Sequence, residues 1–221
     1  GTGKTAAFTL PILQKMVDHA KETVKGSPRA LILSPTRELA EQLEKTIAAY
    51  AQFLPIKVSS IYGGVKMSGQ EKKLRAGVDI LIATPGRLLE HITQCNVNLS
   101  QTEFVVLDEA DRMLDMGFIA DINKIVERLP KQRQNLLFSA TLSDRVRSLA
   151  KTAIDDAVEI SVSPDSATTS KIDQWLITVD KGNKSSLLSH LIKVQEWQQT
   201  LIFIETKHGA AKLVSQLEKR G

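Results

Sequence analysis

The chain has 221 residues, of which 42% are hydrophobic and 24% charged, a balance typical of a globular protein with one large domain or one domain and part of another. The net charge of +4 is compatible with an anionic partner. The only cysteine, Cys95, excludes an internal disulfide bond and a cysteine-based metal cage. No apolar run reaches transmembrane length, so we expect no membrane association and a cytoplasmic location.

The chain opens with GTGKT, residues 1–5, which matches the last residues of the G-x-x-x-x-G-K-[ST] phosphate loop. In that pattern Gly1, Thr2 and Gly3 bring backbone N–H groups close to phosphate oxygens. Lys4 supplies a charge for the β/γ-phosphates, and the Thr5 hydroxyl can ligate Mg²⁺. A helix is expected to follow to about residue 20, with its N-terminus facing the anion. An ordinary Gly-rich helix start is the alternative.

Apolar runs typical of buried strands alternate with helical segments along the next part of the chain. Strands are expected at 30–33, 57–62, 78–83, 104–107, 134–138 and 157–161, and helices at 37–53, 70–76, 121–129 and 144–152. Such alternation predicts an α/β fold with a parallel sheet and helices on both faces.

Polar, Gly-bearing or Pro-bearing residues follow one strand after another on its C-terminal side. Open α/β sheets bind ligands along the edge where the strands end. Thr36, Gly63, Thr84, Asp108 and Ser139 are therefore expected along one rim, with the phosphate-loop residues beside them. The alternative, that loops are polar in any protein, predicts a scattered composition.

The run FVVLDEAD, residues 104–111, reads as a buried strand that ends in Asp108, Glu109 and Asp111. Three carboxylates at the end of a buried strand are costly unless a positive partner is bound there. A Mg²⁺ ion that carries nucleotide phosphates would be such a partner. The alternative is the acidic first turn of an ordinary helix.

A second, shorter unit is expected after residue 162, because residues 163–171 have the Ser, Thr, Pro and Asp composition of a linker. Beyond it, a strand at 172–179, a helix at 184–194, a strand at 200–204 and a helix at 207–219 read as the start of another α/β domain. We therefore expect a first domain at 1–162 and a second at 172–221, in a chain truncated at both ends.

Taken together, GTGKT, PTRELA, GG, TPGR, DEAD, SAT and LIFIETK occur in the order found in DEAD-box ATP-dependent RNA helicases of superfamily 2, and nearly the whole chain resembles this family. The stretches DEADRMLDMGF, KQRQNLLFSAT and WQQTLIFIETKHGAAKL most resemble the bacterial RhlE-like branch. The resemblance implies a RecA-like domain of the P-loop NTPase class, followed by the beginning of a second RecA-like domain. It also implies ATP-driven unwinding or remodelling of RNA and, by analogy, work in ribosome assembly or RNA turnover.

The resemblance further implies a role for individual residues. Lys4 would contact the β/γ-phosphates of ATP, Thr5 and Asp108 would hold Mg²⁺, and Glu109 would activate the attacking water. Asp111 would bond toward Ser139 and Thr141 and so link hydrolysis to unwinding. The RNA backbone would be contacted by Pro35, Thr36, Arg37, Gly63, Gly64, Thr84, Pro85, Gly86, Arg87 and, in the second domain, Thr206.

Two other functions remain open at this point. One is a P-loop ATPase that acts on a substrate other than RNA, and the other is an ATP-gated RNA clamp without hydrolysis. The sequence contains neither the adenine-recognition segment nor the arginine finger of the family. Because loss of an arginine finger costs about 10³–10⁵ in rate, the chain itself is expected to be nearly inactive.

Overall fold

The computed structural model describes residues 3–154, 157–161 and 173–219. The chain divides into two compact units, Gly1–Glu159 and Ile160–Gly221. Each unit is described by itself below. In the described part of the chain, no helix is long and apolar enough to cross a membrane.

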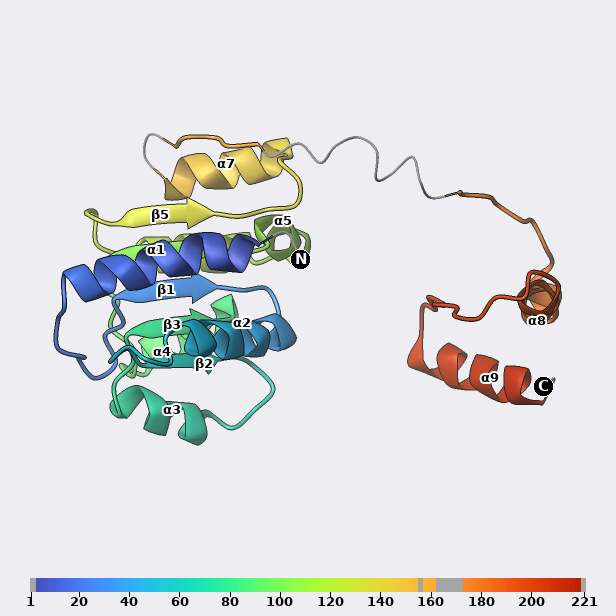
Figure 1. Ribbon diagram of the computed structural model, residues 1–221, viewed down its shortest axis with the longest axis horizontal. Coiled ribbons are helices and arrows are strands. Elements are labelled where there is room, and N and C mark those ends of the chain that lie inside the picture. The colour runs from blue at the N-terminus through green and yellow to red at the C-terminus, as the bar shows by residue number, and fades with distance from the viewer. Residues whose placement is uncertain (1–2, 155–156, 162–172, 220–221) are drawn as a thin grey trace. The chain divides into compact units, whose positions relative to one another are not determined.

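The first unit is built on a sheet of five parallel strands in the order β2-β3-β1-β4-β5 (Figure 1). The strands are β1 (Ala30–Leu33), β2 (Val58–Ile61), β3 (Ile80–Ala83), β4 (Phe104–Leu107) and β5 (Gln134–Leu137). Every pairing is parallel, so all five strands end at the same edge of the sheet. The predicted parallel α/β fold is thus confirmed.

Helices cover both faces of this sheet, as the alternating pattern predicts (Figure 1). On one face lie α1 (Lys4–Asp18) and α2 (Arg37–Tyr50). The other face carries α3 (Met67–Arg75), α4 (Pro85–Thr93), α5 (Ala110–Asp115), α6 (Ile119–Val126) and α7 (Asp144–Ala153). Helix α4 was not expected, because its first residues had been interpreted only as a motif, and a helix at α5 had been considered only as the alternative interpretation of the acidic residues 108–111.

The core is split into two clusters by the alternation of side chains along each strand. In β1, Ala30 and Ile32 pack under α1 and α2, whereas Leu31 and Leu33 pack under the helices of the opposite face. All four residues are buried, as they are in β3 and β4. A strand buried on both faces reads as a continuous apolar run, which is why these three strands could be predicted from the sequence.

Residues 157–161, expected to form a strand, have no strand conformation. Val158 and Ile160 are 84% and 80% exposed. Val158 and Ile160 are apolar and alternate with other residues, as in a strand. However, a strand forms only where a neighbouring strand pairs with its backbone, and the sheet ends at β5.

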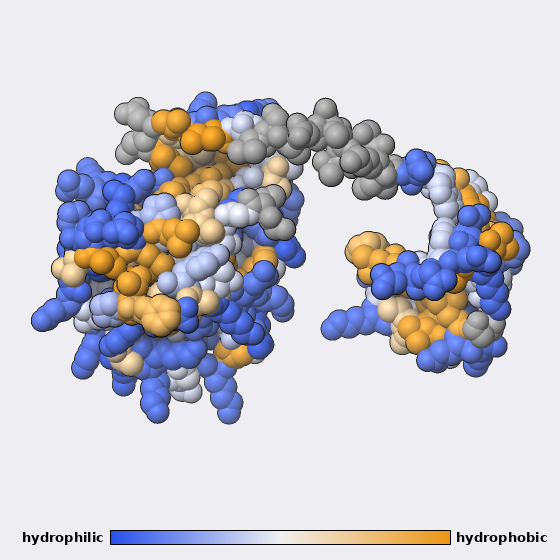
Figure 2. Space-filling model, viewed as in Figure 1, coloured by the Kyte–Doolittle hydropathy of each residue, from blue (hydrophilic) through white to orange (hydrophobic). Residues whose placement is uncertain are grey.

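The second unit contains a short 3₁₀ helix, η2 (Lys181–Asn183), and the helices α8 (Lys184–Val194) and α9 (Lys207–Glu218). The expected helices are confirmed, but residues 173–179 and 200–204 form no strand, which corrects that expectation. Neither segment has a backbone ladder partner among the described residues, and Leu176 and Phe203 are 93% and 87% exposed. Hydrophobic residues accordingly show on the surface of this unit (Figure 2). The expected linker, 163–171, lies outside the described residues.

Candidate functional site

The first element of the site is the start of α1. Gly3 caps the helix in a left-handed conformation, φ 75°, and has no side chain to occupy the first-turn N–H groups. Lys4 and Thr5 form that first turn and are partly exposed. Free N–H groups and the helix dipole together favour an anion here. Gly1 and Thr2 lie outside the described residues.

Asp108 follows β4 directly and faces the same region. Its backbone N–H donates to the carbonyl of Leu33 at 3.0 Å, which fixes it at the end of two neighbouring strands. Burial raises the pKa of Asp108, and the Glu109 carboxylate adds to the rise, while the positive charge of Lys4 opposes it. Lys4 and Asp108, far apart in the sequence, therefore lie close enough to interact electrostatically.

This arrangement fits Mg²⁺ bound together with phosphates. Among the described residues, no group of three or more His, Cys, Asp or Glu side chains could hold a metal by itself. Mg²⁺ is commonly held by one or two carboxylates together with water and substrate phosphates. Asp108 is a half-buried carboxylate that would supply the protein ligand, and the N-terminus of α1 is the kind of position that favours phosphates.

Glu109 lies at the junction between β4 and α5 in an unusual backbone conformation. Its φ and ψ are 53° and 51°, the left-handed region that non-glycine residues seldom adopt. Its N–H donates to Asp108 Oδ1 at 3.1 Å, and its carboxylate pairs with Arg112 at 3.2 Å. Such backbone strain tends to occur at functional sites.

Asp111 joins α5 to the loop after β5. Its Oδ2 accepts hydrogen bonds from the backbone N–H and the hydroxyl of Thr141, both at 3.1 Å. Burial alone would raise the pKa of Asp111, but hydrogen bonds, led by the one from the Thr141 hydroxyl, lower it. The Ser139 hydroxyl donates to the Thr141 carbonyl at 2.7 Å. The contact that the resemblance implies between Asp111 and Thr141 is present, with Ser139 bracing the same loop.

The residues expected to face RNA lie after β1, β2 and β3, on the half of the edge away from β5. After β1, Pro35 is buried, and the Thr36 hydroxyl accepts from the N–H of Leu39 at 3.3 Å as the cap of α2. Arg37 is exposed, pairs with Glu41 at 2.9 Å and lies 5.1 Å from the centre of the Tyr62 ring.

The loop after β2 and the start of α4 complete this half of the edge. Gly63 and Gly64 are exposed, and Gly64 has a φ of +80°. Thr84 precedes α4 without capping it, so its hydroxyl is not used by the helix end, while Pro85 is buried and Gly86 is partly exposed. The side chain of Arg87 is only 10% exposed and pairs with Glu90 at 2.9 Å.

Thr206 belongs to the second unit, where its hydroxyl accepts from the N–H of Gly209 at 3.0 Å and caps α9. It is exposed, and it stays a prediction as an RNA contact.

Sequence reasoning missed three residues that shape this edge. Tyr62 lies beside the Arg37–Glu41 pair, and hydrogen bonding to Tyr62 is the largest cause of the lowered pKa of Glu41. Gln70 and His91 are buried and bond to each other at 3.2 Å. The one signal in the sequence was the spacing of Leu88 and His91, because residues three apart lie on the same face of a helix and both of these are buried in α4.

Comparison with known proteins shows the family to which the chain belongs. Residues 1–149 match the model of the DEAD/DEAH box helicase family. The chain is 39% identical to "ATP-dependent RNA helicase RhlB" of Pseudomonas aeruginosa and covers 57% of that protein. It is 39% identical to "ATP-dependent RNA helicase SrmB" of Escherichia coli and covers 50% of it. Both alignments include the whole chain, which thus spans about half the length of these relatives.

The fold has a close counterpart among solved structures. A crystal structure of a hypothetical ATP-dependent RNA helicase from Sulfolobus tokodaii is 36% identical, with a TM-score of 0.63. The match covers 71% of this chain and 44% of that one, and it supports a RecA-like domain. The RhlE-like branch is not distinguished by these matches and stays a prediction. With the family model over residues 1–149 and the motif residues gathered at one edge of the sheet, the chain belongs to the DEAD/DEAH box helicase family.

Proposed function

We propose that this chain binds ATP with Mg²⁺, and RNA, along one edge of its sheet, as part of an ATP-dependent RNA helicase that unwinds or remodels RNA duplexes locally. The observation that carries the proposal is that the first turns of α1 lie at the ends of β4 and β5: the Phe8 ring is 5.3 Å from that of Phe138, whose carbonyl accepts from the N–H of Ala110. The charge of Lys4 opposes the raised pKa of Asp108, which agrees with this placement. An ordinary Gly-rich helix start would have no reason to face a half-buried carboxylate. The named relatives, both ATP-dependent RNA helicases, support the same function.

In the nucleotide site, Lys4 and the first-turn N–H groups of α1 bind the phosphates. Thr5 and Asp108 hold Mg²⁺, which neutralises phosphate charge when bound. Glu109 orients the attacking water, and its pairing with Arg112 sets the direction of its carboxylate. Phosphoryl transfer needs mainly positioning and charge neutralisation, which these groups provide.

In the RNA site, the exposed groups suit a sugar–phosphate backbone. Arg37 offers a guanidinium, Gly63 and Gly64 offer backbone that a ligand can approach closely, and Thr84 offers a hydroxyl. Contacts of this kind give affinity without sequence choice. The Asp111–Thr141 contact lies at the β4–β5 end of the same edge and would link the nucleotide site to the rest of the protein.

The test is binding of a fluorescent ATP analogue to the chain, with and without Mg²⁺. We expect Lys4→Ala to weaken binding about ten- to a hundredfold, because one charge-assisted contact is worth about 1.5–3 kcal/mol. Lys15→Ala, at the other end of the same helix, is the matched control and should leave binding unchanged. Asp108→Asn should abolish the gain in affinity from Mg²⁺. Equal affinities for wild type and Lys4→Ala would refute the nucleotide site.

Hydrolysis separates the helicase from the alternatives. In the whole protein, RNA-stimulated ATP turnover should exceed DNA-stimulated turnover and should be lost in Glu109→Gln, while nucleotide binding persists. ATP-dependent RNA binding without turnover in the whole protein would instead establish a clamp.

A further inference from the structure

The loop after β2 is tied down at both ends by side chains from two different helices. We call residues 62–66 the glycine loop. Gln70 of α3 donates from Nε2 to the carbonyl of Tyr62 at 2.9 Å, and Arg87 of α4 donates from Nη1 to the carbonyl of Val65 at 3.0 Å. Between these two points, an added Cβ on Gly63 or Gly64 would meet nothing within 4 Å. The loop is therefore fixed at its ends and open at its middle.

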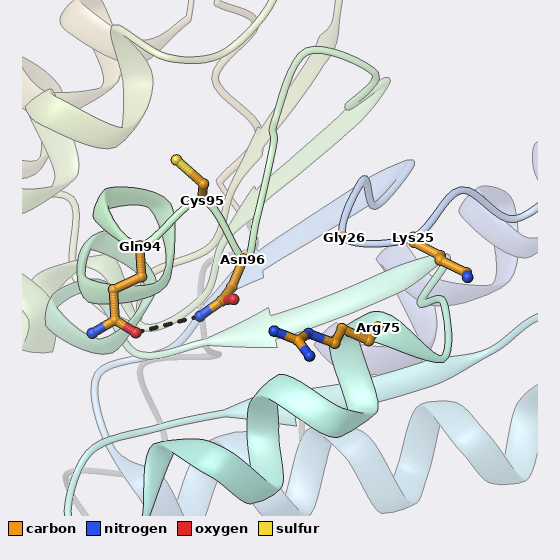
Figure 3. A pocket seen from close by; sticks show the side chains of 6 residues that line it. All are labelled: Lys25, Gly26, Arg75, Gln94, Cys95 and Asn96. Carbon is orange, nitrogen blue, oxygen red and sulfur yellow. Dashed lines mark hydrogen bonds between the residues drawn. The ribbon is translucent and has the colours of Figure 1, made fainter.

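Gln70 is itself held by a chain of buried hydrogen bonds. His91 Nε2 lies 3.2 Å from Gln70 Oε1, and Asn96 Nδ2 lies 3.3 Å from His91 Nδ1. The Asn96 amide also donates to Gln94 Oε1, at the rim of a cavity of about 300 Å³ (Figure 3). The network thus runs from that cavity to the glycine loop.

The chemistry of these groups fixes the direction of the network. The Gln70 amide nitrogen donates to the Tyr62 carbonyl, so its oxygen faces His91 and must accept from Nε2–H. His91 Nδ1 then carries no proton and accepts from the Asn96 amide. Both ring nitrogens of His91 are satisfied when the ring is neutral, so one histidine tautomer and one glutamine orientation are selected.

Helix packing does not require these polar groups. His91 is 0% exposed and Gln70 is 6% exposed, yet α3 and α4 bury apolar residues elsewhere, such as Leu74 and Leu88. Buried polar side chains cost free energy unless they are satisfied, and a satisfied network specifies one arrangement of the backbone it bonds to. Here that backbone is the carbonyl of Tyr62, next to Gly63.

We propose that Gln70 and His91 are positioning residues that hold the glycine loop in the shape that receives the sugar–phosphate backbone of RNA. The inference rests on the proposed RNA-binding function of this edge. Arg87 acts on the other end of the loop, so part of the role of the TPGR motif is to shape Gly63 and Gly64 for the ligand.

The experiment combines two readouts on the folded chain. The first is the backbone amide order parameters of residues 63–66, measured by 15N relaxation, and the second is binding of a fluorescently labelled single-stranded oligouridine. Gln70→Leu should lower the order parameters in the glycine loop and weaken RNA binding about fivefold, the equivalent of one hydrogen bond of about 1 kcal/mol. ATP-analogue binding and the order parameters of β1 should not change. Gln101→Leu, at an exposed glutamine before β4, is the control.

A pair of histidine variants tests the relay. His91→Leu should behave like Gln70→Leu, whereas His91→Gln keeps an N–H donor toward Gln70 and should restore most of the wild-type behaviour. Unchanged loop order parameters in Gln70→Leu, or lower order parameters throughout the sheet, would overturn the proposal. If the wild-type chain bound no RNA, the proposed function would fail, and the loop order parameters alone would decide whether Gln70 and His91 position the loop.

Discussion

The contact between Asp111 and Thr141 offers a direct test of how α5 is coupled to the loop after β5. Thr141→Val keeps the shape of the side chain and the backbone N–H, but removes the hydroxyl that donates to Asp111 Oδ2 at 3.1 Å. Asp111→Ala removes the acceptor of both Thr141 bonds and of the Arg112 N–H. The two single variants and the double variant form a mutant cycle, which isolates the energy of the hydroxyl–carboxylate pair.

The expected coupling energy follows from the charge and the exposure of this pair. A hydrogen bond to an ionised group contributes about 1.5–3 kcal/mol when it is well shielded. Asp111 is partly buried and Thr141 is exposed, so water competes for the bond and its energy falls below this range. We expect a coupling of about 1 kcal/mol, while Asp111→Ala alone should cost more because its other partners lose their acceptor as well.

Urea unfolding, followed by circular dichroism, measures the four free energies of unfolding in the cycle. Thr46→Val is the matched control, because the Thr46 hydroxyl donates to the Gln42 carbonyl within α2 and should show no coupling to Asp111. A Thr141–Asp111 coupling below about 0.3 kcal/mol, within the error of such cycles, would refute the reasoning. ATP-analogue affinity should stay the same in Thr141→Val, because Lys4 and Asp108 are not touched.

Two further predictions concern buried groups of the first unit. Arg29 bonds to Glu103 at 2.7 Å and to the carbonyls of residues 16 and 19, so Arg29→Met should lower the free energy of unfolding, measured in urea, by about 3 kcal/mol. The control is Arg75→Met, because Arg75 is exposed and pairs only within its own helix, and it should cost less than about 0.5 kcal/mol. Equal losses in the two variants would contradict this prediction. Burial, together with the positive charge of Arg87, lowers the pKa of His91 in the folded protein. Neutral His91 therefore contributes its full stabilisation above the unfolded-state pKa of about 6.5, and this contribution is lost as the pH falls from about 6.5 through the lower folded-state pKa. Between pH 7 and 5.5, the urea midpoint of wild type should fall more steeply than that of His91→Gln, and parallel slopes would exclude this contribution.

The sequence predicted those features that depend on local pattern. The runs of β1, β3 and β4 are continuous and apolar because both faces of each strand are covered, and that burial pattern is visible without coordinates. The position of the functional edge followed as soon as the strands were taken as parallel. Strand order could not be predicted, because adjacent strands such as β1 and β4 are joined only through long-range pairing. For the same reason, the apolar run at 200–204 was taken as a strand although nothing among the described residues pairs with it.

Within the candidate site, the motifs located the right edge but did not distinguish residues that face a ligand from residues that shape the backbone. Pro35 and Pro85 are buried, Thr36 caps α2, and Arg87 bonds to the carbonyl of Val65. Each of these has a local structural task that would select the same residue in the absence of RNA. The groups left open to a ligand are Arg37, Gly63, Gly64, Thr84 and Gly86. The shape of that open surface depends on Gln70 and His91, which belong to none of the motifs, because a glycine-rich loop has no side chains with which to fix itself.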